Sequence, residues 1–484
     1  MTLLGAIIAS IFVAQLILVF GFVLTERRQP AATLAWIMGV IFLPVVGAVL
    51  YLVFGMRRMV RHSERYEQVA RNVDEALAKA GLLDGLRQLQ VGDNVVDRTT
   101  VMATLGAHVA TLPPLAGNQC RALINGPTAY RAMFEAISGA EHHIHVQFYV
   151  IKPDRTGLAL RSRLIERAKA GVQVRVLTDG VGSFSLPDDF WEPLREAGGQ
   201  AGVFSPVSLL YRVRKPDRIN YRNHRKIVVV DGLTGFTGGI NIGAEYLSLD
   251  EDIGKWRDTH LQIDGNAVIA LQRTFAEDWL WTTDELLAAP HYYPITDIGP
   301  EGANSVQIID SGPDRRWSPL QRLYVQAIAL AQQRVWITSP YFIPDAVMEE
   351  ALFTASIRGV DVRLLLPKKS DHPIVDLASK SHYARLLESG IKIYEYGRGF
   401  VHAKTLVVDE WVSSIGSANM DIRSFHLNFE ANAFIYDPDF AKELADVFVS
   451  DLEDSKMVNL SSEKRIGYLT RLQRGFARLL SPLL

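Results

Sequence analysis

The sequence predicts an α/β protein with two duplicated lobes, each built on a mixed sheet flanked by helices, preceded by an N-terminal transmembrane helical hairpin. Two observations carry this prediction. Residues 1–60 hold two long uncharged apolar runs, whereas residues 106–455 contain an internal repeat in which helical segments alternate with β-rich runs. The length of 484 residues agrees with this division, because at roughly 150 residues per domain it corresponds to about three structural units.

The composition is that of a globular protein with balanced charge. The chain has 51 basic and 53 acidic side chains, a formal net charge of −2 and 48% hydrophobic residues. These values exclude a disordered polyelectrolyte and a broadly basic nucleic-acid coat, so any attraction for an anionic partner must come from a local patch. The single cysteine, Cys120, excludes an intrachain disulfide and a Cys-rich zinc site.

The hairpin is expected in residues 1–60. Leu3–Leu24 and Ala31–Met56 run for 22 and 26 residues without a charge, and each can cross a hydrocarbon core of about 30 Å as a helix. The short connector Thr25–Pro30 returns the chain to its starting side. The arginines after the second run outnumber the two of the connector, which favours a cytoplasmic position for the rest of the chain: Arg57, Arg58, Arg61 and Arg65. A cleaved signal peptide is the alternative, and the missing positive n-region and the second run argue against it.

The remaining segments follow from periodicity and composition. Residues 61–105 are expected to form a helical stalk, because Val69, Val73, Leu77 and Ala80 recur at helical spacing. The first lobe is assigned to residues 106–290 and the second to 305–455, with a linker rich in Pro, Gly and Asn between them. Corresponding β-rich runs of the two lobes are His143–Val146 with Val335–Ile337 and Gly171–Leu177 with Gly359–Leu365.

One motif occurs in both copies. The pattern H-x-K-x4-D is formed by His224, Lys226 and Asp231 in the first lobe and by His402, Lys404 and Asp409 in the second. In both copies a turn of small residues and an asparagine follow at the same spacing, ending in Asn241 and Asn419. Two matches in one frame are far more specific than a single short motif. If each motif lies on a strand, its histidine and lysine share a face, and its aspartate faces away as a supporting structural group.

Two His–Lys pairs in one site suit phosphoryl transfer on a diester. One neutral imidazole attacks phosphorus and forms a phosphohistidine, while the other protonates the leaving alkoxide; we favour His224 as the attacking group. Lys226 and Lys404 stabilise the charged oxygens, so neither a metal nor another cofactor is expected. Asp258 and Glu430 are the aligned acids that could hold the two Nδ1–H groups. Asn241, Asn419 and Ser417 could donate hydrogen bonds to phosphate oxygens.

Three further patterns have weaker functional meaning. His142, His143 and His145 resemble a metal cluster, but neighbouring strand residues point to opposite faces, so no metal site is expected. A basic patch precedes the first motif: Arg212, Arg214, Lys215, Arg218, Arg222, Arg225 and Lys226. Residues 456–484 are expected to form a basic amphipathic helix that lies on a membrane surface or packs on the body, with Ile466, Leu469, Leu472, Phe476 and Leu479 on one face.

The duplicated motif resembles the signature of the phospholipase D superfamily, and the N-terminal runs resemble the membrane hairpin of bacterial cardiolipin synthases. The stretches Ser339–Pro344, Pro367–His372 and Gly399–Lys404 extend the resemblance over nearly the whole chain. One departure is visible, because the first lobe has Gly239 where the second has Ser417. The resemblance implies a multi-pass protein of the bacterial inner membrane, with its lobes in the cytoplasm. It also implies that two phosphatidylglycerol molecules become cardiolipin and glycerol through a phosphatidyl-histidine.

Other functions stay open at this point. A phospholipase D-type hydrolase would give the phosphatidyl group to water, and a membrane-anchored nuclease of the same superfamily would cleave nucleic acid. The membrane runs favour phosphatidylglycerol and anionic lipids as partners, and no nucleic acid is expected. A non-catalytic membrane scaffold is a further class, but both motifs keep every titratable residue.

Overall fold

A computed structural model describes residues 3–24, 30–43, 46–48, 51, 59–79, 98–110, 112–206, 221–248, 254–295, 304–315 and 317–481. The chain divides into two compact units. The first unit comprises residues 1–65 and 207–221, and the second comprises residues 66–206 and 222–484. The predicted phosphoryl-transfer residues all belong to the second unit.

The first unit contains the two apolar segments. Helix α1 (Leu3–Leu18) continues as a π-helical turn, η1 (Val19–Val23), and helix α2 (Pro30–Phe42) follows. Val23, Val40 and Tyr51 are buried in a small apolar cluster of this unit, and Gln15 Nε2 donates to the carbonyl of Val40 at 2.7 Å. Within the ranges that the structure describes, no helix is both long enough and apolar enough to cross a membrane. The connector residues 25–29 and the arginines Arg57 and Arg58 lie outside those ranges, so the transmembrane hairpin stays a prediction.

The second unit is organised on one 15-stranded sheet rather than on a separate sheet for each lobe. Its order is β19-β13-β12-β10-β15-β16-β18-β9-β1-β8-β6-β5-β2-β3-β4. The strands of the first half are β1 (Leu115–Ile124), β2 (His143–Phe148), β3 (Gln173–Asp179), β4 (Gln200–Phe204), β5 (Ile227–Val230), β6 (Thr234–Gly238) and β8 (Thr259–Gly265). Those of the second half are β9 (Asn304–Ser311), β10 (Arg334–Thr338), β12 (Asp361–Pro367), β13 (Lys392–Tyr396), β15 (Thr405–Val408), β16 (Val412–Gly416), β18 (Glu430–Tyr436) and β19 (Ser455–Met457).

The strand order reveals a pseudo-twofold arrangement. Read outward from the junction of β1 and β9, the first half runs β1-β8-β6-β5-β2-β3-β4 and the second runs β9-β18-β16-β15-β10-β12-β13. In each half the strands near the junction pair antiparallel and the equivalent outer strands pair parallel, while β19 adds antiparallel to β13 at the edge of the second half, so the sheet is mixed as predicted. The two lobes share a sheet because β1 and β9, equivalent edge strands, pair with each other and satisfy backbone groups that an isolated lobe would expose.

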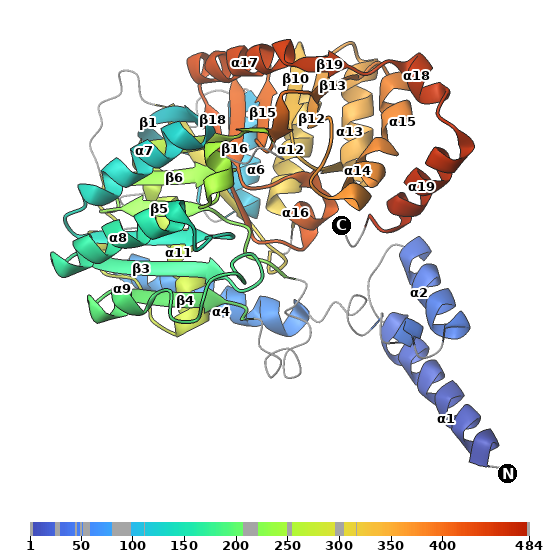
Figure 1. The fold of residues 1–484 in the computed structure, drawn as a ribbon, viewed down its shortest axis with the longest axis horizontal. Coiled ribbons are helices and arrows are strands. Elements are labelled where there is room, and N and C mark those ends of the chain that lie inside the picture. The colour runs from blue at the N-terminus through green and yellow to red at the C-terminus, as the bar shows by residue number, and fades with distance from the viewer. Residues whose placement is uncertain are drawn as a thin grey trace. The chain divides into compact units, whose positions relative to one another are not determined.

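Helices cover the sheet and form one core in each half (Figure 1). In the first half, α7 (Asn125–Ser138) and α8 (Arg155–Lys169) pack on Ile144 and Val146, while α11 (Val268–Thr283) covers the opposite face, where Phe275 stacks on His145 with a centroid distance of 4.6 Å. In the second half the helices are α12 (Pro319–Leu330), α13 (Ala346–Ile357), α14 (Pro373–Lys380), α15 (Tyr383–Glu388) and α17 (Pro438–Glu453). Two shorter helices are α9 (Glu192–Glu196), which packs beside α8 and β4, and α16 (Ile422–His426), whose Arg423 lines the cavity described below.

The segment expected as a stalk packs on the body where the structure describes it. Its helices are α4 (Met59–Lys79) and α6 (Arg98–Val109), and residues 80–97 lie outside the described ranges. Val73 and Leu77 of α4 are fully buried, and Asp74 pairs with Arg273 of α11 at 2.8 Å. Met102 of α6 belongs to the core of the second half. The helical spacing seen in the sequence therefore marks a packed face.

The C-terminal residues form three short elements rather than one helix. Strand β19 is followed by α18 (Leu460–Lys464) and α19 (Tyr468–Leu479), with Asn459 capping α18 and Gly467 preceding α19. Ala477 of α19 is buried beside Ala378 of α14 and Ile343. The large apolar side chains of α19 remain exposed, as Leu469 at 72%, Leu472 at 57% and Phe476 at 65% demonstrate.

Candidate active site

Each motif histidine lies in an extended segment that pairs with the opposite half of the sheet. The strands β5 and β15 begin only at Ile227 and Thr405, so the His–Lys pairs precede them instead of lying on them as expected. The His224 N–H donates to the carbonyl of Phe429 at 2.9 Å, and the His402 N–H donates to the carbonyl of Arg257 at 2.7 Å. These bonds to the other half take the histidines out of the strand ladder and bring them together.

The carboxylates that hold the imidazoles also come from the opposite half. His224 Nδ1 lies 2.9 Å from Glu430 Oε2, and His402 Nδ1 lies 2.7 Å from Asp258 Oδ2. Both carboxylates are fully buried, whereas 12% of the His224 side chain and 9% of the His402 side chain are exposed. Because each Nδ1–H donates to a carboxylate, each Nε2 keeps its lone pair.

Burial keeps both imidazoles neutral near pH 7. It lowers the pKa of His224 to about 4, and the charge of Lys226 contributes to the decrease. Burial also lowers the pKa of His402 to about 4, with Lys404 as the neighbouring cation. Burial alone would raise the pKa of Glu430, but His224, Lys226 and the Ser417 hydroxyl together outweigh burial and lower that pKa to about 2. The site therefore combines neutral nucleophiles with ionised orienting groups.

The two lysines lie beside the histidines and are buried with them. Lys226 Nζ donates to the carbonyl of His224 at 2.6 Å, and Lys404 Nζ donates to the carbonyl of His402. Burial lowers the pKa of Lys404 to about 8 and that of Lys226 well below its usual value. A phosphate anion between the histidines would favour the charged ammonium forms.

Asp231 and Asp409 lie away from the histidines, beyond the far ends of β5 and β15. Both adopt a left-handed conformation, with φ of 54° and 49°. The Asp231 carboxylate accepts from the backbone N–H groups of residues 141, 142 and 143. That of Asp409 accepts from the N–H groups of residues 332, 333 and 334 and from Arg98. In these positions the carboxylates tie the turns before β2 and β10 to the motif strands.

The three expected phosphate donors occupy two kinds of position. Asn241 and Asn419 line the cavity in front of the histidines. The Ser417 hydroxyl is fully buried and donates to Glu430 Oε2 at 2.5 Å, so it supports the orienting carboxylate. At Gly239 a Cβ would lie 2.1 Å from Asp258 Oδ1. Gly239 therefore leaves room for the Asp258 carboxylate, whereas Ser417 donates a hydrogen bond to the Glu430 carboxylate.

The histidines open into a cavity of about 710 Å³ lined by both halves of the sheet. The ring of Tyr149 lies 5.0 Å from that of His224, and the ring of Trp256 lies 5.4 Å from that of His402. Several lining residues had no role predicted from the sequence, among them Tyr246, Trp256, Asp421 and Arg423. A comparison of the two copies beyond the asparagines would have exposed one of them, because Arg423 and Glu245 occupy equivalent positions with opposite charge.

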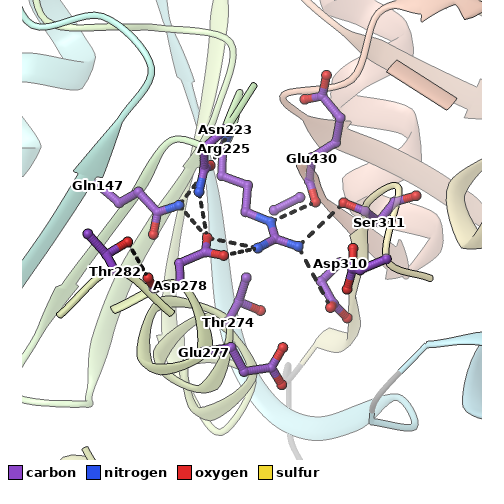
Figure 2. Close-up of polar contacts among 12 residues, drawn as sticks. Gln147, Asn223, Arg225, Thr274, Glu277, Asp278, Thr282, Asp310, Ser311 and Glu430 are labelled. Atoms are coloured by element: carbon purple, nitrogen blue, oxygen red, sulfur yellow. Dashed lines mark hydrogen bonds and ion pairs between the residues drawn. The ribbon is translucent and has the colours of Figure 1, made fainter. Parts of the chain in front are cut away.

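Arg225, between His224 and Lys226, belongs to a buried network rather than to a surface patch (Figure 2). Its guanidinium forms two 2.8 Å bonds to the Asp278 carboxylate, and its Nε donates to the carbonyl of Glu430 at 3.1 Å. Asp278 also accepts from Gln147 at 2.6 Å and from Asn223 at 2.8 Å. Arg225 therefore joins the motif of one half to the acid-bearing strand of the other. The patch residues Arg212, Arg214, Lys215 and Arg218 lie outside the described ranges.

Replacing Arg225 by Met is expected to lower the free energy of unfolding by about 3–5 kcal/mol, because Asp278 would keep a buried charge without its cation. The double variant Arg225→Met/Asp278→Leu should recover much of this loss. Urea titration of the full chain in detergent measures both. Arg398→Met is the control, because its ion pair with Asp454 is largely exposed. A loss below about 1 kcal/mol in the single variant would contradict the network's structural role.

The histidines of strand β2 are buried in the first half of the sheet. Among the described residues, no group of three or more His, Cys, Asp or Glu side chains is arranged to hold a metal ion. His143 and His145 instead pack as buried rings with a centroid distance of 4.8 Å. Burial lowers the pKa of His143 to about 4.

The chain is similar to known proteins over nearly its whole length. The family profile described as cardiolipin synthase, PLD-like domain, matches residues 133–279 and 324–452, and the profile of the phospholipase D-nuclease N-terminal segment matches residues 7–55. A cardiolipin synthase of Alkalihalophilus pseudofirmus is 40% identical over 99% of this chain and 94% of its own length. The major cardiolipin synthase ClsA of Bacillus subtilis is 39% identical over 100% of both chains. A solved phosphatidylserine synthase of Haemophilus influenzae shares the fold, with a TM-score of 0.60 and 16% identity over 80% of this chain and 100% of its own.

Proposed function

The chain belongs to the phospholipase D-like cardiolipin synthase family, and we infer that it converts two phosphatidylglycerol molecules into cardiolipin and glycerol. The observation that supports this most strongly is the pair of histidines at one cavity, each held by a carboxylate of the opposite half. Such a site suits the exchange of one phosphodiester for another, because it offers a nucleophile, an acid and positive charge together.

The first step forms a covalent phosphatidyl-enzyme. Nε2 of one histidine attacks the phosphorus of phosphatidylglycerol, a nitrogen–phosphorus bond forms, and the bond to the glycerol headgroup breaks. The other histidine gives its proton to the departing glycerol oxygen. The bound phosphodiester is negatively charged and raises the pKa of this imidazole. The histidine therefore carries the extra proton when substrate is bound. Glu430 and Asp258 keep each ring in the orientation that aims Nε2 at the cavity.

The second step reverses the first with a lipid acceptor. The histidine that lost its proton removes a proton from a headgroup hydroxyl of a second phosphatidylglycerol, and the resulting oxygen attacks phosphorus. The nitrogen–phosphorus bond breaks and cardiolipin leaves. Lys226 and Lys404 balance the charge on the phosphoryl oxygens in both steps.

The balance of bonds leads to a test of transfer against hydrolysis. One phosphodiester is broken and one is made, so added glycerol is expected to convert cardiolipin back to phosphatidylglycerol. Purified protein should therefore form cardiolipin as the main product on pure phosphatidylglycerol vesicles, measured by mass spectrometry of all lipids. If phosphatidic acid predominates and glycerol drives no reverse reaction, the protein is a phospholipase D-type hydrolase.

We propose that the chain is held at the bacterial inner membrane by residues 1–60 as a two-helix hairpin, with the lobes on the cytoplasmic side. The uncharged runs and the match of residues 7–55 to the N-terminal family profile support this proposal. We also propose that α19 lies on an anionic bilayer. Its exposed leucines and phenylalanine share the helix with Arg471 and Arg478, and its buried Ala477 contacts Ile343, which lines the cavity.

The triple variant Leu469→Ser/Leu472→Ser/Phe476→Ser is expected to lower activity on phosphatidylglycerol vesicles about tenfold or more, because each serine weakens burial in the acyl region. Activity on short-chain, monomeric phosphatidylglycerol should change little, since that substrate needs no bilayer docking. The matched control is Leu158→Ser/Leu233→Ser/Leu286→Ser, which alters three other exposed leucines. Equal loss on both substrates would indicate a folding defect and contradict the docking role.

A further inference from the structure

The two halves of the sheet place different charged residues at equivalent positions of the cavity. Arg222 precedes His224 by two residues, and the equivalent position before His402 is Phe400. Arg423 follows Asn419 by four residues, and the equivalent position after Asn241 is Glu245. Glu245 is neutralised by Lys152 at 2.8 Å. The two halves therefore offer equal reactive groups but unequal charge around them.

Both arginines line the cavity. Arg222 precedes His224 by two residues, and Arg423 interacts with Tyr149 and Glu430, the two groups beside His224. Arg222 is 6% exposed, and its Nη1 lies 3.8 Å from Asp179 Oδ1. Burial lowers the pKa of Arg423, the nearby carboxylate of Asp421 opposes this decrease, and the positive charge of Arg222 adds to it, so the two cations influence each other. Tyr149 is close to both, and burial raises its pKa to about 12, which keeps its hydroxyl protonated as a donor. Two neighbouring guanidinium groups at a cavity wall favour an anion with several acceptor oxygens.

The proposed reaction requires such an anion. The histidines and lysines serve the phosphorus that is attacked, whereas the acceptor lipid brings a second phosphodiester. Cardiolipin carries both, joined by one glycerol, so repulsion between them must be offset. We propose that Arg222 and Arg423 bind the phosphodiester of the second lipid, the one that is not attacked. This assignment rests on the proposed synthase function.

The position of this subsite assigns a different role to each histidine. In an in-line displacement the acceptor oxygen approaches phosphorus from the side opposite the attacking nitrogen. With the acceptor phosphate at Arg222 and Arg423, its glycerol hydroxyl enters beside His224. His224 then exchanges protons with the hydroxyl, and His402 carries the phosphatidyl group. This order is the reverse of the one favoured from sequence.

Two reactions of the same protein separate the second phosphate from the first. Exchange of labelled glycerol into phosphatidylglycerol uses one phosphate and an uncharged acceptor, whereas cardiolipin formation uses two phosphates. In Arg222→Gln and Arg423→Gln, cardiolipin formation is expected to fall about 30-fold or more, while glycerol exchange stays within about threefold of wild type. Arg423→Lys should restore part of the loss, because it keeps the charge without the two-pronged geometry.

Each alternative has a distinct result. If exchange and cardiolipin formation fall together, the arginines serve the attacked phosphate and the subsite is wrong. If neither reaction changes, the arginines bind no substrate phosphate and the subsite is again wrong. If wild type gives phosphatidic acid instead of cardiolipin, the proposed function itself fails. Arg398→Gln, an exposed arginine paired with Asp454 at 2.9 Å, is the control and should alter neither reaction.

Discussion

Alanine at His224 or at His402 is expected to reduce conversion of phosphatidylglycerol to cardiolipin by about 10⁴-fold or more, because residues that act as one catalytic unit fail together. One variant lacks the nucleophile and the other lacks the group that moves the proton of the alkoxide. The assay follows cardiolipin on vesicles by mass spectrometry. Half of the wild-type activity in each variant would indicate two independent sites and contradict the shared cavity.

A leaving group that needs no proton distinguishes the two variants. With phosphatidyl-p-nitrophenol, His224→Ala is expected to release about one equivalent of nitrophenol per enzyme in a burst, because His402 can still attack. His402→Ala should give no burst. Acid-quenched His224→Ala should carry the phosphatidyl group on His402, seen by peptide mass spectrometry. A burst only in His402→Ala would reverse this assignment and would also remove the subsite at Arg222 and Arg423.

Neutralising the orienting acids has the second largest expected effect. Glu430→Gln and Asp258→Asn are each expected to lower kcat by about 10²–10⁴-fold, because the amide no longer enforces the Nδ1–H form of the ring. Both substitutions should leave the fold largely intact, because each amide has nearly the same size as the acid that it replaces. Each variant acts on the histidine of the other half, so Asp258→Asn should impair the nitrophenol burst and Glu430→Gln should affect mainly the later proton transfer.

The same variants should change the pH dependence of kcat/KM. Burial lowers the pKa of both histidines to about 4, so on the acidic side the free protein should keep its neutral nucleophile down to about pH 5 and lose activity below that as the nucleophile is protonated. The carboxylate partners oppose burial and raise the imidazole pKa. Removing either charge should therefore move the acidic limb to lower pH. A limb near pH 6.5 in wild type would mean that the imidazoles are not buried as described.

The duplication and the family could be read from the sequence alone, which also predicts the reacting residue types. Two copies of H-x-K-x4-D in one frame are a local pattern, and local spacing is readable without a fold. The α/β arrangement of helices on a sheet also followed from the sequence pattern, because apolar spacing reflects which face of each element is buried.

Only the tertiary structure decided how these groups meet. His402 and Asp258 are 144 residues apart, and His224 and Glu430 are 206 apart. Local sequence does not distinguish a histidine–carboxylate pair within one half from a pair across the halves. Each histidine meets the carboxylate of the other half because β1 and β9 join the halves into one sheet. The same association buried Arg225, which looks like a surface cation in the sequence, against Asp278 and the carbonyl of Glu430. Long-range contacts depend on how two surfaces pack, and the packing of the halves has no signature in residue spacing.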